Sequence, residues 1–275
     1  MTMVRTPPPP PLPVRDRGAE PDWDRAALSP MLTRLAEERA TGVLVREHGT
    51  LHLAEGRVVH AESPLAPGLG LLLTAHGTLE PATWRQAAER AGDAPGAARL
   101  LLGAGRLTAG ALELCHLGAV FDAGYFALAP SGTPGHFRYG PVTAPAALRP
   151  VPVTALERET LRRRLLLHRV WPDPATDSAP LIRADPATAP QVTPRQRAVL
   201  TRVNGDRTAA GIALELGRPA FHTLMDVRRL AAAGLVVPDP AAPDPPAHPP
   251  PPPSPPVTDP DIALLKRLRD ALEAL

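Results

Sequence analysis

The 275-residue sequence has little cysteine, lysine or aromatic content, and each shortage excludes something. Its single cysteine, Cys115, excludes an intramolecular disulfide framework and fits a reducing compartment. Of the 30 basic residues only Lys266 is a lysine, a bias typical of a GC-rich bacterial genome. Apolar runs stay well below the ~18 residues of a transmembrane helix, and no apolar segment marks a signal peptide. We therefore expect a cytoplasmic protein with no membrane partner.

A catalytic constellation is also missing from the sequence. Gly103, Gly105 and Gly110 resemble a phosphate-binding loop only superficially, because no strand precedes them and no Gly-Lys-Ser or Gly-Lys-Thr follows. Cys115 lies among leucines, which predicts a buried and unreactive thiol. We expect no enzymatic activity and no cofactor.

The best candidates for metal ligands are three histidines and a glutamate: His48, His52, His60 and Glu62. If the chain pairs around a turn at Glu55-Gly56, His52 and His60 face opposite sides of the sheet. Structural zinc needs four converging ligands. The pattern therefore predicts ordinary strand histidines and no metal site.

Proline is the residue in clear excess, with 38 where an average chain would have about 14 at ~5%. Half of these prolines lie in the short tracts 7–13 and 238–260. We interpret residues 1–21 as a disordered proline-rich arm and 239–258 as a proline-rich linker. Such tracts are flexible spacers or ligands for proline-reading domains.

Residues 42–62 have the clearest β pattern of the chain. Three strand-like segments, 43–46, 50–53 and 57–61, are separated by His48-Gly49 and Glu55-Gly56. Each X-Gly pair supplies the positive φ that a tight hairpin requires. A helix start at Ser29-Pro30 precedes this region, and a short strand over 135–139 follows later. The pattern predicts a small antiparallel β-meander.

An internal repeat with an offset of 28 residues follows the meander. Leu72-Leu73 and Gly77 in the first copy match Leu100-Leu101 and Gly105 in the second. Each copy predicts a short apolar helix, a glycine cap and a second helix. A third helix is predicted over 114–128, so the meander carries a helical insertion.

Three short motifs give residues 22–148 a family likeness. They are Thr41-Gly42-Val43-Leu44, the segment Glu55-Gly56-Arg57-Val58-Val59-His60-Ala61, and Gly135-His136-Phe137. With the helical insertion between them, they make residues 29–140 resemble the PATAN (PatA N-terminal-like) domain. The resemblance implies an α/β interaction domain for signalling through protein–protein contact, with no catalytic residues to carry over.

Residues 152–192 are predicted to be a bridging helix and a linker. The helix, 154–171, has two apolar stripes, and helices of this kind connect domains or dimerise. Arg162-Arg163-Arg164 lies between the stripes, and we interpret it as a solvated face.

Residues 193–238 have the pattern of three short helices. The first spans 194–202, Thr208 caps the second and Gly217 ends it, and the third begins at Pro219. Helical spacing in the third helix gives a core face of Phe221, Leu224, Val227 and Ala231, and an outer face of His222, Asp226 and Arg229. The segment resembles an all-α winged-helix or MarR-like helix-turn-helix module, with a wing strand expected at Val236-Val237.

The helix-turn-helix resemblance implies double-stranded DNA as a partner. The segment carries a local charge of +4 within a chain of net charge +2. We take Arg218, His222, Thr223 and Arg229 as the candidate DNA contacts. Asp226 on the same face and Pro238 at the start of the wing argue against DNA. A wingless module of this shape also docks on proteins or dimerises, so both readings stay open.

The last 17 residues, 259–275, predict an amphipathic helix with leucines in a coiled-coil-like spacing. We take them as candidate partner-binding residues: Leu265, Leu268, Leu272 and Leu275. A helix of this length is marginal alone, so it is expected to pack on its own chain, a second protomer or a partner.

Together these patterns predict an α+β protein: an antiparallel β-meander with a helical insertion, followed by an all-α helix-turn-helix domain. The first functional hypothesis is a bacterial transcriptional regulator, in which a PATAN-like interaction domain is coupled to DNA binding. The alternative is a scaffold or adaptor that binds proteins, through helix 154–171, through helix 259–275 or as a homodimer.

Overall fold

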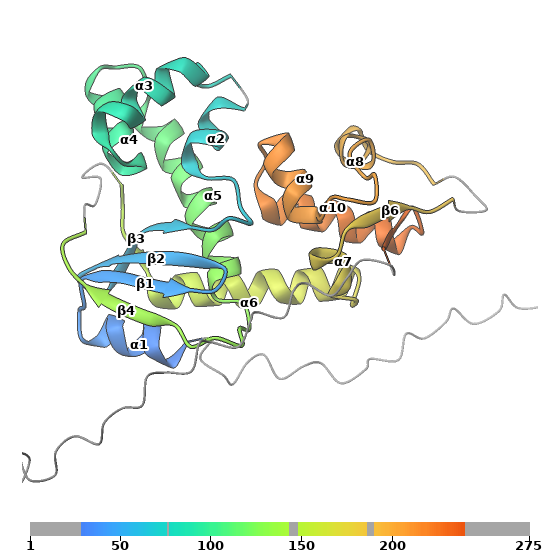
Figure 1. Ribbon diagram of the computed structural model, residues 1–275, viewed down its shortest axis with the longest axis horizontal. Helices are drawn as coiled ribbons and strands as arrows, with labels where there is room; N and C mark the ends of the chain where they lie inside the picture. Colours follow the sequence, from blue (N-terminus) through green and yellow to red (C-terminus); the bar gives the residue numbers. More distant parts are fainter. Residues whose placement is uncertain (1–28, 76, 143–147, 186–189, 240–275) are drawn as a thin grey trace, which may run out of the picture. The chain divides into compact units, whose positions relative to one another are not determined.

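The computed structural model describes residues 29–75, 77–142, 148–185 and 190–239. The chain divides into two compact units, Met1–Pro238 and Asp239–Leu275, and every described residue except Asp239 belongs to the first. The described part is mixed α and β with antiparallel sheets, as predicted (Figure 1). The predicted arm 1–21 and the predicted C-terminal helix 259–275 with its four leucines lie outside the described residues.

The main sheet has five strands in the order β4-β1-β2-β3-β5, all paired antiparallel. The predicted meander forms its centre as β1 (Gly42–Arg46), β2 (Gly49–Ala54) and β3 (Arg57–Glu62). The predicted closing strand is β4 (His136–Tyr139), which pairs with β1. The short β5 (Val151–Pro152) pairs with β3, so the segment between the two predicted domains contributes the far edge of the sheet.

The β2–β3 turn shows why the X-Gly pattern predicted this fold correctly. Glu55 and Gly56 both have positive φ, 50° and 74°, which matches the twist of a tight hairpin. Gly56 also lies against the helix α1 (Pro30–Glu37), and a Cβ there would be 2.5 Å from the carbonyl oxygen of Ala36. Its N–H donates to the carbonyl of Ala40 at 2.9 Å. A glycine is therefore required by both conformation and space.

A β-bulge corrects the prediction made for the two strand histidines. Between His52 and Leu53 the register shifts, so that Leu53 pairs with Val58 but His52 pairs with His60. Val59 is the extra residue of the bulge. His52 and His60 therefore lie on the same face, with ring centroids 5.3 Å apart, and not on opposite faces.

The predicted helical repeat forms four helices: α2 (Leu69–Thr74), α3 (Pro81–Ala91), α4 (Ala94–Gly103) and α5 (Ala109–Ala127). The repeat extends to hydrogen bonds, because Gly77 donates to Thr74 and Gly105 donates to Leu102, 28 residues later. The second helix of copy two and the separate helix predicted over 114–128 are one continuous helix, α5. A mainly aliphatic core fills the insertion, including Leu73, Ala97 and Leu112.

Helix α6 (Val153–Val170) belongs to two cores. Its first turns, at Val153 and Leu156, pack with Leu51 and Val120 beneath the sheet. Its last turns, at Leu167, pack with a second core in the C-terminal part of the chain. The predicted bridging helix therefore joins the two cores, and it contacts α1, α5 and α10 (Ala220–Ala232) along its length (Figure 1).

The second core is enclosed by α7 (Ala175–Ser178), α8 (Pro194–Leu200), α9 (Ala209–Leu216), α10 and a two-stranded sheet. We call residues 175–238 the helical segment. Its strands, β6 (Leu181–Arg183) and β7 (Val236–Pro238), pair antiparallel. The segment is therefore not all-α: the stretch predicted to be a linker supplies one helix and one strand.

Candidate functional site

The first place where reactive side chains gather is the β-bulge. The rings of His52 and His60 are neighbours, and His116 of α5 stacks on His60 with ring centroids 6.1 Å apart. Burial lowers the pKa of His116 to about 4 and lowers the pKa of His52. His60 bonds to Glu62 at 3.0 Å, which holds the pKa of that carboxyl below its usual value. Among the described residues no group of three or more His, Cys, Asp or Glu is arranged to hold a metal ion.

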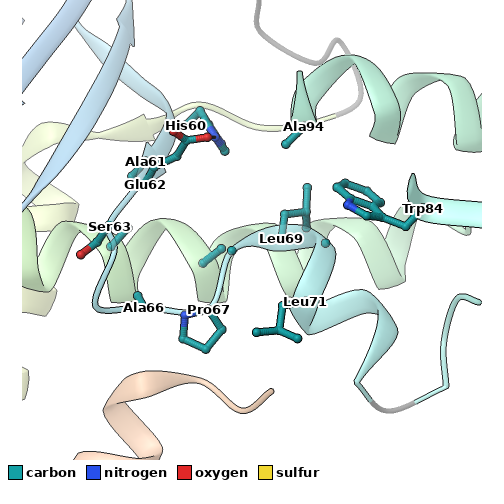
Figure 2. A pocket seen from close by; sticks show the side chains of 14 residues that line it. His60, Ala61, Glu62, Ser63, Ala66, Pro67, Leu69, Leu71, Trp84 and Ala94 are labelled. Atoms are coloured by element: carbon teal, nitrogen blue, oxygen red, sulfur yellow. Dashed lines mark hydrogen bonds and ion pairs between the residues drawn. The ribbon is translucent and has the colours of Figure 1, made fainter. Parts of the chain in front are cut away.

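A cavity of about 360 Å³ adjoins this histidine cluster (Figure 2). It is bounded by the end of β3, the start of α2, and parts of α3, α4 and α5. His60 and Glu62 lie together on one side of it, and Trp84 lies opposite them. The sequence did not predict this site, because the bulge that groups the histidines has no signature in the strand pattern.

Cys115, which the sequence predicted to be a buried thiol, is half-buried, and burial raises its pKa.

The predicted helix-turn-helix elements are the second candidate site, and their ends are capped as expected. Thr193 and Gln196 form a capping box at α8, and the Thr208 hydroxyl accepts from the N–H of Gly211 at α9. Gly217 ends α9 in the left-handed conformation, with φ 59°. The sequence therefore predicted the three helices from local signals alone.

Helix α10, the predicted recognition helix, is enclosed to a degree that the sequence did not indicate. The predicted core face is buried: Phe221, Leu224, Val227 and Ala231. Five more of its 13 residues are also buried, because α6, α7, α8, α9 and β7 all contact it. A helix that reads DNA must leave one face open to enter the major groove. Helix α10 is a central helix of the second core.

A carboxylate from α5 occupies the N-terminus of α10. Asp122, 1% exposed, accepts the backbone N–H of Ala220. Arg163 of α6 donates to the other oxygen of Asp122 at 2.6 Å, and its guanidinium lies 4.7 Å from the ring centroid of Phe221. Burial raises the pKa of Asp122, while Arg163 acts in the opposite direction. The backbone amides that could meet a phosphate are therefore already used within the chain.

Apolar contacts cover the same end of the predicted helix-turn-helix. Ala66 and Phe126 pack with Ala213 and Ala220 of the two helices. The turn itself approaches α2 so closely that a Cβ on Gly217 would overlap Ala75. The turn between α9 and α10 is thus packed against the helical insertion.

The four predicted DNA contacts have different surroundings. His222 and Arg229 are exposed, as predicted, although Arg229 also lies 3.8 Å from a carboxylate oxygen of Asp226. Arg218 is half-buried, and its Nη1 has no hydrogen-bond partner among the described residues. Thr223 is only 2% exposed, so its hydroxyl cannot reach a base. The four side chains therefore do not form one open surface.

Asp226 corrects the predicted outer face of α10. It is buried, and its two oxygens accept from Arg195 of α8 at 2.9 and 3.0 Å. The helix α8 covers this side of α10 and converts a residue that spacing placed outside into part of an internal ion pair.

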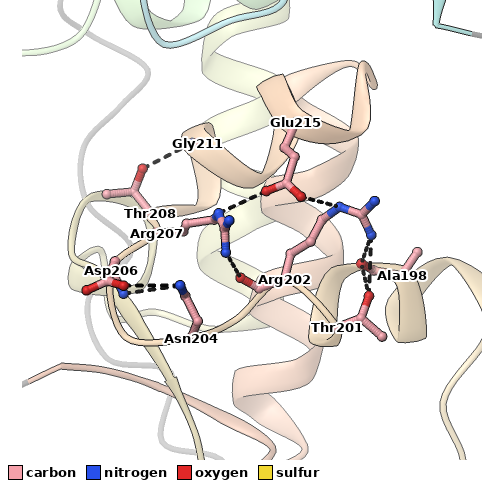
Figure 3. A network of polar contacts seen from close by, with 9 residues as sticks. All are labelled: Ala198, Thr201, Arg202, Asn204, Asp206, Arg207, Thr208, Gly211 and Glu215. Atoms are coloured by element: carbon pink, nitrogen blue, oxygen red, sulfur yellow. Dashed lines mark hydrogen bonds and ion pairs between the residues drawn. The ribbon is translucent and has the colours of Figure 1, made fainter.

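The arginines that suggested nucleic acid are mostly paired inside the segment. Arg202 and Arg207 both reach Glu215, at 3.2 and 2.8 Å (Figure 3). Arg228 is buried and pairs with Asp177 at 2.6 Å. With Arg195 held by Asp226, four of the seven arginines in residues 193–238 have a carboxylate partner within 3.2 Å.

The arginine triplet of α6 is not a solvated face. Arg162 is exposed beside Glu159, but Arg163 is buried in the ion pair with Asp122. Arg164 donates to the carbonyl of Leu128 at 2.6 Å. The one sequence signal for this network is Asp122 itself, the only charged residue in the second half of the mainly apolar helix α5, since a buried carboxylate needs a partner.

The strand after α10 does not continue into a hairpin within the described residues. Instead β7 pairs with β6, and Leu181 of β6 also exchanges backbone hydrogen bonds with Gly205 and Arg207. Residues beyond Asp239, where a wing would lie, are outside the described part.

Comparison with family models, curated proteins and solved structures finds no match to this chain. None of the helices within the described residues is long and apolar enough to cross a membrane. The case for a function therefore depends on the geometry above.

Proposed function

We propose that this chain is a non-catalytic regulatory adaptor that acts by binding another protein, and that its helix-turn-helix does not read DNA. The observation that carries the proposal is Asp122, which occupies the N-terminus of α10 together with Arg163. That end of the helix is the part a helix-turn-helix protein directs at DNA. Here it is the joint between α5, α6 and α10.

The electrostatics support the same proposal. DNA affinity comes largely from cationic side chains that neutralise phosphates. In this segment Arg195, Arg202 and Arg207 already face carboxylates, so binding a phosphate would break an existing ion pair. The local +4 already counts Glu215 and Asp226 as negative charges, and the pair of Arg228 with Asp177, which lies outside the counted residues, lowers it by one more.

The PATAN-like interpretation of residues 29–140 supports an interaction role, since that family likeness implies protein contact and no catalysis. We place the adaptor in the bacterial cytoplasm on the sequence grounds given above. The most exposed large apolar side chain among the described residues is Leu114 of α5, 75% exposed, in the helical insertion. We take the surface around it as the contact for the partner.

A DNA titration of the full chain separates this proposal from transcriptional control. We expect no binding of mixed-sequence duplex at low salt, whereas a phosphate-binding helix would give a log–log salt slope of about −0.9 per phosphate contact. The variant Asp122→Ala frees the α10 N-terminus, and we expect it to remain inactive on DNA. Salt-dependent binding by the wild-type chain, or binding gained on Asp122→Ala, would overturn the proposal.

A second experiment tests whether the surface around Leu114 contacts the partner protein. A photo-crosslinking residue placed at Leu114 is expected to capture one defined protein in the host cell, and Leu114→Glu should abolish co-purification of that protein. A crosslinking residue at exposed His136, on β4, is the matched control. Equal capture from both positions contradicts the assignment of the surface.

A further inference from the structure

We propose that the cavity between β3 and the helical insertion binds a small organic cation, an alkylammonium or guanidinium group with an apolar body. The inference does not rest on the adaptor role, because Asp122, Arg163 and Leu114 are not among the residues that line the cavity. It follows from the size of the cavity, the sign of its charge and its aromatic wall.

The cavity exists because small residues line it. Half of its 14 lining residues are alanine or glycine, and these come from β3, the connection from β3 to α2, α2, α4 and α5. The volume of about 360 Å³ falls at the lower end of the ~300–1,000 Å³ of ligand pockets. A ligand with a short apolar chain would contact Leu69, Leu71 and Pro67.

The charge of the lining favours a cation. Glu62 is the only carboxylate among the lining residues, and none of them is lysine or arginine. One carboxylate oxygen bonds to His60, while the other, Oε2, has no partner among the described residues. The hydrogen bond from His60 lowers the pKa of Glu62, so the carboxylate is ionised at neutral pH. A second cavity of about 350 Å³ shares Glu62 and Ser63, which keeps this carboxylate accessible.

Trp84 supplies the aromatic wall opposite Glu62 (Figure 2). Its indole packs against Gly70, where a Cβ would overlap the ring nitrogen. Glycine at position 70 therefore lets the indole reach its place beside the cavity. An indole is the best partner for a cation among the aromatic side chains.

Binding of n-butylammonium to the full chain, measured by calorimetry, tests this inference. We expect saturable binding, with n-butanol and butyrate at least about tenfold weaker because they lack the positive charge. Glu62→Gln should weaken butylammonium binding by about tenfold, and exposed Glu89→Gln on α3 should leave it unchanged. Equal affinity for the alcohol and the amine, or no loss in Glu62→Gln, overturns the inference.

A second variant tests the role of Trp84 as the aromatic wall of the cavity. Gly70→Ala displaces the indole of Trp84 without changing the charge of the cavity. It should therefore weaken the binding of butylammonium, while the circular dichroism spectrum remains that of the folded chain. Retained affinity in a folded Gly70→Ala chain would contradict the role of Trp84.

The cation has two possible sources, a free amine or the lysine side chain of a partner protein. A lysine peptide blocked at both ends distinguishes them in the same assay. Tighter binding of the peptide than of butylammonium, lost in Glu62→Gln, assigns the site to a protein side chain. Binding of butylammonium alone assigns it to a free amine, and binding of neither overturns the proposal. The DNA titration above is unaffected by all of these outcomes.

Discussion

The sheet and the helical segment are held together by different kinds of contact. Beneath the sheet the core is almost wholly aliphatic, with Leu44, Leu51 and Leu53 fully buried. The helical segment is also apolar inside, but it contains an arginine–carboxylate pair, Asp177 with Arg228. It meets α5 and α6 at a second pair, Asp122 with Arg163, where Asp122 also accepts the N–H of Ala220. In a chain with 3% aromatic residues, arginine takes over part of the packing, as where Arg163 lies over Phe121 and Phe221. The same fold thus depends on two kinds of stabilisation.

The largest loss of stability is expected when the ion pair between Arg228 and Asp177 of α7 is broken. Arg228→Ala removes both hydrogen bonds to Asp177, at 2.8 and 2.6 Å, and leaves a carboxylate that is only 18% exposed without its counter-ion. We expect a loss of about 4 kcal/mol in the free energy of unfolding, measured with urea. The neighbouring Arg229→Ala is the control, because Arg229 is half exposed and should cost below about 1 kcal/mol. Similar losses of unfolding free energy in Arg228→Ala and Arg229→Ala would contradict the idea that burial makes the first arginine more important for stability.

A core substitution beneath the sheet should cost a similar amount of stability as Arg228→Ala, but its cost should depend differently on pH. Leu51→Ala leaves a cavity in an apolar core and should cost about 3.5 kcal/mol at every pH at which the chain is folded. Burial raises the pKa of Asp177, and a protonated Asp177 no longer needs a counter-ion. The cost of Arg228→Ala should therefore shrink as the pH falls, while that of Leu51→Ala stays constant. Parallel changes with pH would contradict the comparison.

The sheet side has a titrating group with a strongly lowered pKa, His116, which packs against β3. Its pKa is about 4 in the fold and near the ordinary histidine value of 6.5 in the unfolded chain. As the pH falls from 6.5 towards 4, the unfolded chain takes up a proton that the native chain does not, so stability falls by up to about 3 kcal/mol. His116→Gln should flatten this part of the stability curve, and exposed His136→Gln should not. An unchanged slope in His116→Gln would show that other groups cause the loss.

The smallest effect is expected where an arginine pair is exposed. Arg207→Ala removes one of two arginines from Glu215, in a network open to solvent. We expect a loss below about 1 kcal/mol that disappears at high salt, measured by the same urea titration. A cost approaching that of Arg228→Ala would mean that burial is not what separates the two kinds of arginine.

Local signals predicted the elements of this fold well. The Glu55-Gly56 turn, the matched glycines of the repeat and the Thr208 cap each depend on a few neighbouring residues, and each forms as expected. The bulge at His52 was missed because strand alternation cannot reveal where one residue is skipped.

The candidate sites were predicted less well, because they depend on contacts between residues far apart in the chain. Asp226 is on the outer side of α10 by helical spacing, and Thr223 was a candidate DNA contact, yet both are buried because α6 and α8 cover that helix. Asp122 meets Ala220 across 98 positions of sequence. No periodicity within one helix carries that information.

The junction between β5 and α6 has a mechanical consequence. The chain leaves β5 at Pro152 and is helical from Val153, so no slack separates the sheet edge from the helix. A force applied along α6 is transmitted directly to β5, which is attached to β3 at only Arg57 and Val58. Under tension this two-residue strand is the weakest link of the sheet. It would peel away first and leave the edge of β3 exposed, while the meander behind it stays intact.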